Sequence, residues 1–170
     1  MRKLLLQGLL KAPLTEAAPE DAAVEKLAAE LNGAARARLG RSLSIREVDA
    51  GSCNGCELEI HALGNAFYDL ERFGLHVVAS PRHADVLLVT GPVAKNMAEA
   101  LKRTYDATPA PKWVVAAGDC AINGGIFAGS SACAGGVEAI VPVDLRIPGC
   151  PPTPVALLTG LLALLRAGKG

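Results

Sequence analysis

The stretch 85–117, DVLLVTGPVAKNMAEALKRTYDATPAPKWVVAA, decides the fold class. It opens with a continuous apolar run, Asp85–Thr90, which predicts a strand that is buried on both faces of a sheet. Residues 94–105 predict a helix, and Lys112–Ala117 predict a second strand. Strand, helix and strand in this order are typical of a crossover unit in a parallel sheet.

The same alternation extends in both directions from this stretch. It predicts further strands at 44–48, 75–79 and 139–143 and further helices at 57–70 and 154–166. Together these elements predict a three-layer α/β domain with a mainly parallel sheet and helices on both faces. Upstream, residues 19–33 predict an amphipathic helix that begins at Pro19 and ends at Gly33. We therefore expect an N-terminal extension with this helix, residues 1–43, and one α/β domain, residues 44–170.

Composition argues against several classes of protein. Lys and Arg together number 17, as do Asp and Glu, so no excess of positive charge favours nucleic acid as a partner. The longest late apolar run, residues 155–165, would form a helix of about 16 Å, too short for a bilayer core of about 30 Å. The apolar run at 4–10 lacks a convincing cleavage site and indicates a docking or core-covering segment rather than a signal peptide. We expect no transmembrane helix in this chain.

Five cysteines, an odd number at wide spacing, favour a reducing compartment over a disulfide-bonded secreted domain. Four of them fall where predicted strands end. Cys53 and Cys56 follow the strand predicted at 44–48, and Cys120 follows the strand predicted at 112–117. Cys150 follows the last extended segment. Because ligands bind outside the carboxyl ends of parallel strands, three loops should deliver four thiols to one edge of the sheet.

Four thiolates at one place suit a [4Fe–4S] cluster, and the glycines beside each cysteine let backbone N–H groups approach the sulfurs. Three alternatives stay open on the residues alone. A structural zinc site would use the same Cys-x-x-Cys pair, although such sites usually draw on a second close pair. A redox dithiol would leave Cys120 and Cys150 without a role, and buried inert cysteines are also common. We interpret Cys133 as a free thiol near the site.

Five motifs carry a resemblance to a known family, and they cover about residues 44–166. The motifs are GSCNGCELEI (51–60), ERFGLHVV (71–78), SPRHADVLLVTGPV (80–93), GDCAINGGIF (118–127) and VPVDLRIPGCPPTP (141–154). In these motifs the chain resembles the small, cluster-bearing subunit of energy-converting, membrane-bound [NiFe] hydrogenases of the formate hydrogenlyase type. The same family includes the subunit of respiratory complex I that carries the last cluster before quinone.

The resemblance implies a flavodoxin-like fold and one [4Fe–4S] cluster with Cys53, Cys56, Cys120 and Cys150 as its four metal ligands. It implies an oxidoreductase subunit that relays electrons to or from a nickel–iron site in a large partner subunit. A ferredoxin-like electron-carrier subunit and membrane-arm subunits are the other implied partners. The implied location is cytoplasmic, peripheral on the inner face of the cell membrane through the complex.

The first cysteine pair separates two branches of this family. In the complex I branch the two cysteines of this pair are adjacent. Here Asn54 and Gly55 separate them, as on the hydrogenase side. Many relatives carry Arg and Glu where this chain has Thr153 and Val155. Two alternative functions are an equivalent cluster subunit of a quinone- or ion-pump-linked complex without a nickel site, and a zinc-stabilised interaction module.

Glu59, in the predicted helix after Cys56, matches an acidic position of the complex I relatives. A buried carboxylate with a raised pKa can exchange protons near neutral pH, so Glu59 is a candidate for proton transfer. The alternative is a carboxylate favoured by the positive end of the helix dipole, which applies equally to Glu57.

Overall fold

The computed structural model describes residues 21–167. The predicted docking segment at 4–10 and the predicted helix start at Pro19 lie outside the described residues.

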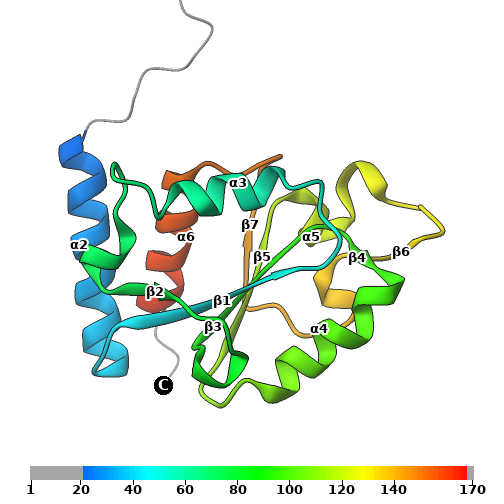
Figure 1. Ribbon diagram of the computed structural model, residues 1–170, viewed down its shortest axis with the longest axis horizontal. Helices are drawn as coiled ribbons and strands as arrows, with labels where there is room; N and C mark the ends of the chain where they lie inside the picture. Colours follow the sequence, from blue (N-terminus) through cyan, green and yellow to red (C-terminus); the bar gives the residue numbers. More distant parts are fainter. Residues whose placement is uncertain (1–20, 168–170) are drawn as a thin grey trace, which may run out of the picture.

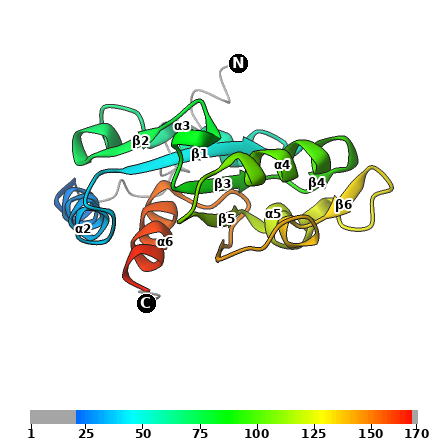
Figure 2. The same cartoon turned by 90° about the horizontal axis from the view of Figure 1, so that it is seen from below.

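A five-stranded sheet forms the centre of the molecule (Figures 1 and 2). Its strands are β1 (Leu43–Asp49), β2 (Leu75–Val77), β3 (Val86–Thr90), β5 (Trp113–Ala117) and β7 (Leu145–Ile147). They lie in the order β2-β1-β3-β5-β7, and every neighbouring pair is parallel. Numbered along the chain, these five strands have the order 2-1-3-4-5 of flavodoxin-like folds. After β2 is added on one side of β1, the remaining strands are added on the other side, so the topological switch point lies between β1 and β3. The predicted α/β, flavodoxin-like architecture is confirmed.

Helices cover both faces of this sheet, which accounts for the continuous apolar run of β3. Val86 and Leu88 of β3 face one cluster of buried side chains, and Leu87 and Val89 face the other. The first cluster is closed by α2 (Asp21–Leu39), α3 (Gly55–Ala62) and α6 (Pro154–Arg166), and the second by α4 (Lys95–Ala107) and α5 (Asp119–Asn123). Among residues 21–167, no helix is long and apolar enough to cross a membrane.

Helices α2 and α6 lie side by side at one end of the molecule (Figure 1). Leu31 and Ala35 of α2 are fully buried in the same cluster as the inner face of α6. The guanidinium of Arg38 donates to the carbonyl oxygens of Leu164 and Leu165, at 2.7 and 3.0 Å. These carbonyls at the C-terminal end of α6 thereby gain hydrogen-bond donors.

The division of the chain into residues 1–43 and 44–170 stays a prediction.

Helix α2 also runs past its predicted end at Gly33 and stops at Leu39. A glycine inside a helix costs only about 1 kcal/mol, and burial of Ala35 against α6 outweighs that cost. The predicted end was therefore wrong, because tertiary contacts extend the helix beyond a local stop signal.

The helix predicted over 57–70 is shorter, since α3 ends at Ala62. The side-chain oxygen of Asn65 accepts hydrogen bonds from the amides of Phe67 and Tyr68, at 2.8 and 3.0 Å, and closes a turn there. A short 3-10 helix, η1 (Leu70–Phe73), then leads into β2.

The strand predicted at 139–143 is also wrong. A 3-10 turn, η4 (Val137–Ala139), occupies this region, and β7 begins only at Leu145. The Gly-rich stretch 118–136 contains α5, η3 (Gly125–Phe127) and β6 (Cys133–Gly135). Strand β6 pairs antiparallel with β4 (Val93–Ala94), outside the main sheet.

Replacement of Leu158 by alanine should lower the free energy of unfolding by about 2–5 kcal/mol, because this fully buried side chain of α6 would leave a cavity under the sheet. The same substitution at Leu58 of α3, which is 62% exposed, should change it by less than about 0.5 kcal/mol. Urea unfolding followed by circular dichroism measures both. Equal losses in the two variants would contradict the assignment of α6 to the core.

Candidate functional site

Four cysteines line one pocket of ≈80 Å³ beyond the carboxyl ends of β1, β5 and β7. Cys53 lies in the loop after β1, and Cys56 lies in the first turn of α3. Cys120 lies in the first turn of α5, and Cys150 lies in the loop after β7. Cys53 and Cys150 are exposed, Cys56 is half-buried and Cys120 is buried, so the pocket opens to the surface on one side. The structure therefore brings together the four thiols that the strand positions singled out.

Two glycines make room for the sulfur atoms. A Cβ atom at Gly118 would stand 2.7 Å from the Sγ of Cys56, and one at Gly125 would stand 2.7 Å from the Sγ of Cys120. Both glycines have a positive φ, +90° and +50°, which L side chains rarely adopt. The backbone of the β5–α5 region thus lies directly against two of the four thiols.

Hydrogen bonds join two of the three loops to each other and brace the third. The amide of Asp119 donates to the carbonyl of Gly149 at 2.9 Å, and the amide of Gly149 donates back to the Asp119 carboxylate at 2.9 Å. On the other side, the Asp49 carboxylate accepts from the amides of Gly51 and Ser52, at 2.8 and 2.7 Å. The positions of Cys120 and Cys150 are therefore coupled, and the loop of Cys53 is tied to the end of β1.

The thiols are close enough to affect one another's ionisation. Burial raises the pKa of Cys56 to about 12, and the carboxylate of Glu57 and the sulfurs of the other three pocket cysteines add to the rise. Burial also raises the pKa of Cys120, with smaller contributions from Cys150 and Cys53, while a hydrogen bond from the Ile126 amide acts in the opposite direction. A positive metal group in the pocket would favour thiolates, and its binding would release protons.

Cys133 does not line this pocket. It is half-buried in β6, where it pairs with Ala94 of β4. Within residues 21–167, no three His, Cys, Asp or Glu side chains lie close enough to share a single metal ion.

Glu59 lies half-buried on α3 but is not among the residues that line the cysteine pocket. Burial raises the pKa of the Tyr68 phenol, and the charge of Glu59 adds to this rise. The role of Glu59 in proton transfer stays a prediction.

Glu57 is the carboxylate that is built into the site. It is 7% exposed, and its Oε2 accepts a hydrogen bond of 2.6 Å from the Ser52 hydroxyl. Its Oε1 is buried without a hydrogen-bond partner among the described residues.

Sequence reasoning gave Glu57 only a helix-dipole role, and it did not consider Glu47. Burial raises the pKa of Glu47, and the charges of Glu57 and Asp49 raise it further. The signal for Glu47 was present, since Ile45 and Glu47 share one face of a strand.

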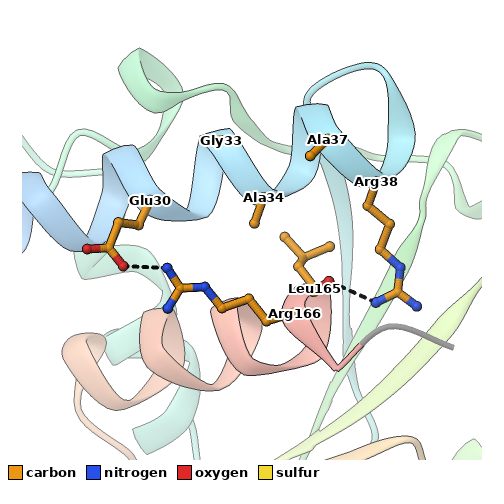
Figure 3. A pocket seen from close by; sticks show the side chains of 7 residues that line it. All are labelled: Glu30, Gly33, Ala34, Ala37, Arg38, Leu165 and Arg166. Carbon is orange, nitrogen blue, oxygen red and sulfur yellow. Dashed lines mark hydrogen bonds and ion pairs between the residues drawn. The ribbon is translucent and has the colours of Figure 1, made fainter.

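A wider depression of ≈550 Å³ lies between α2 and α6, far from the cysteines in the sequence (Figure 3). Its charged groups are already paired. Glu30 contacts Arg166 at 2.7 Å, and Arg38 donates to the end of α6. Side chains that satisfy one another in this way stabilise the helix pair and leave no reactive group in the depression.

Comparisons with known proteins find one family and several relatives. The sequence profile of the family described as "NADH ubiquinone oxidoreductase, 20 Kd subunit" matches residues 53–164, a range that contains all four pocket cysteines. A protein of Pyrococcus furiosus named "Probable membrane-bound hydrogenase subunit mbhJ" is 48% identical over 132 residues, which are 77% of this chain and 79% of that protein.

Formate hydrogenlyase subunit 7 of Escherichia coli is 44% identical over 147 residues. The match covers 86% of this chain but only 58% of that subunit. Among solved structures, a chain of the membrane-bound sulfane sulfur reductase, an archaeal respiratory membrane complex, is similar with a TM-score of 0.66 and 35% identity. That match covers 83% of this chain and 77% of the other.

Replacement of Gly118 by alanine should destabilise the protein more than replacement of Gly129, because only the first methyl group would collide with a sulfur atom. Both glycines have a positive φ, +90° and +81°, so both variants carry backbone strain of about 1–3 kcal/mol. No atom lies within 4 Å of a Cβ placed at Gly129. Urea unfolding of the two variants isolates the cost of the contact with Cys56, and equal losses would show that the β5–α5 backbone does not approach that thiol.

Proposed function

Since the chain belongs to the family of the NADH ubiquinone oxidoreductase 20 kDa subunit, we propose that it is the electron-transfer subunit of a hydrogenase-type complex. Its ligands for one [4Fe–4S] cluster are Cys53, Cys56, Cys120 and Cys150. Members of this family are subunits of hydrogenases and of complex I-like oxidoreductases, and the chain is accordingly a subunit of an oxidoreductase. The catalytic centre lies in a partner subunit.

The observation that carries this proposal is the single pocket that four cysteines from three loops share. A [4Fe–4S] cluster is held by four cysteine thiolates. The bare backbone at Gly118 and Gly125 beside two of the sulfurs leaves space that any other residue would fill.

Zinc fits these residues less well. Structural zinc sites that use a Cys-x-x-Cys pair usually draw on a second close pair of ligands. Here only Cys53 and Cys56 form a close pair, and Cys120 and Cys150 come from two other loops.

The cluster supplies one-electron redox chemistry when bound, and the chain's own residues hold it and adjust its environment. The backbone amide of Ile126 lowers the pKa of the Cys120 thiol, and hydrogen bonds to ligand sulfurs are one determinant of cluster potential. The exposed side of the pocket, at Cys53 and Cys150, gives a partner direct access.

A nickel–iron site in a large partner subunit is the favoured electron partner. Asn54 and Gly55 separate the first cysteine pair as on the hydrogenase side of the family. One relative is named as a membrane-bound hydrogenase subunit and another as a formate hydrogenlyase subunit. A ferredoxin-like subunit exchanges electrons with the cluster, and membrane-arm subunits place the chain at the inner face of the cell membrane.

A second candidate is the equivalent subunit of a respiratory complex without nickel. The similarity to the sulfane sulfur reductase chain supports it, because that protein is a respiratory membrane complex with a different named reaction. The nickel ligands would belong to the partner, so the large subunit decides between the two candidates. Two Cys-x-x-Cys pairs in the large subunit, together with nickel bound in the purified complex, would establish that the complex is a hydrogenase.

Replacement of Cys120 by serine should remove or alter the cluster, whereas replacement of Cys133 should leave it unchanged, since only Cys120 lines the pocket. Anaerobic purification, iron and sulfide analysis, and EPR of the reduced protein measure the effect. The unchanged chain should contain about four irons. One zinc ion and no reduced-cluster signal would overturn the proposal, and equal damage in both variants would show that the third ligand is misassigned.

Replacement of Ile126 by aspartate should leave the iron content unchanged and slow electron transfer in the complex by about tenfold. Ile126 is 80% exposed beside Cys120, and a charge buried in an interface without a partner costs at least about 1.4 kcal/mol. Ala107→Asp, at the far end of α4, is the control. Turnover with an artificial electron acceptor measures both, and equal rates for Ile126→Asp and the unchanged chain would show that electrons do not leave at this surface.

A further inference from the structure

A second pocket, of ≈400 Å³, lies over β1 and β2 between α3 and η1. We call it the β1–β2 pocket. Its floor consists of seven buried aliphatic side chains, among them Ile45, Leu75 and Leu88. None of the cysteines lines it, so it is separate from the proposed cluster site.

The rim of the β1–β2 pocket is acidic. Three carboxylate residues, Glu47, Asp69 and Glu71, line it together with His61, and no lysine or arginine does. The nearby guanidinium of Arg72 contacts Asp69 at 3.4 Å and Glu25 at 3.2 Å, and it does not line the pocket. An apolar floor below an acidic rim favours a ligand with an apolar body and a positive end.

Glu47 needs a hydrogen-bond donor that the described residues do not supply. Its Oε1 atom is buried and has no hydrogen-bond partner among residues 21–167. The Glu57 carboxylate lies close enough to raise the pKa of Glu47 further, while Arg46 and His61 lower it. A buried carboxylate oxygen without a partner is costly, and a donor from outside would remove that cost.

The mouth of the β1–β2 pocket lies beside an edge of the sheet. Strand β2 is the terminal strand, and its last residue, Val77, is 60% exposed at the pocket. Edge strands present unpaired backbone groups, and extended segments of other chains commonly pair with them. Lysine and arginine bury an aliphatic stem while their charged end seeks polar partners, and arginine is enriched in protein interfaces.

We propose that the β1–β2 pocket receives a lysine or arginine side chain of a partner subunit, with its stem on the aliphatic floor and its charged end at Glu47. Asp69 and Glu71 at the rim attract the same side chain. The inference rests on the proposed membership of the chain in a multisubunit complex. It adds a docking position away from the cysteine pocket.

A photo-crosslinking amino acid at Val77 tests this in the intact complex, purified through a tag on this chain. We expect a crosslink to one partner peptide that contains a lysine or arginine beside apolar residues. In the same background, Glu47→Gln should lower the crosslink yield about tenfold or more, since loss of one member of a buried charge pair strongly weakens an interface. Glu71→Gln at the exposed rim should lower it less. Glu99→Gln, on the exposed face of α4, should leave it unchanged.

Each other outcome overturns the inference. An intact complex without a crosslink from Val77 would show that the pocket faces solvent, and a crosslinked peptide without a basic residue would show that the charge argument is wrong. A small molecule that native mass spectrometry detects in the complex, and that Glu47→Gln removes, would identify a free cation as the occupant. In these three cases the proposed electron-transfer function stands. A chain that purifies without partners would defeat both proposals.

Discussion

Parallel strand pairing is the constraint on which the rest of the structure depends. Strands β1, β3, β5 and β7 run in the same direction, so their carboxyl ends meet at one edge of the sheet. Each loop that leaves this edge starts from a backbone held by neighbouring strands, and hydrogen bonds between Asp119 and Gly149 then tie two of the loops together. The Cys53–Cys56 pair, Cys120 and Cys150 come from three separate parts of the chain and meet because the sheet positions their loops.

Electrostatics opposes this gathering of thiols. The pKa of Cys56 is raised to about 12 by burial, by Glu57 and by the neighbouring sulfurs, so the pocket disfavours four thiolates when nothing positive is present. Metal binding reverses that preference, because positive charge compensates the sulfurs at once. In the β1–β2 pocket the Oε1 atom of Glu47 is likewise buried without a hydrogen-bond donor among residues 21–167. Both pockets therefore carry an electrostatic cost that a positive group would relieve.

Much of the fold could be predicted from short-range patterns, and the departures have physical causes. The buried strand at Asp85–Thr90 and the strand that ends at Ala117 were evident because both faces of the central sheet are covered. The convergence of the four cysteines followed from the strand order. Side-chain hydrogen bonds are not visible in periodicity, so Asn65 ended α3 earlier than apolar spacing indicated. Strand alternation places Glu47 on the same face as Ile45, but the pocket around Glu47 depends on how α3, η1 and the sheet pack together and is not visible in the sequence.

The position of Cys150 has a consequence for the order of folding. It follows β7, the last strand of the sheet along the chain, whereas Cys53 follows the first. The cysteine pocket therefore exists only after β7 has paired with β5. Assembly of the site comes late in biosynthesis, and the completed pocket reports that the whole α/β region has folded.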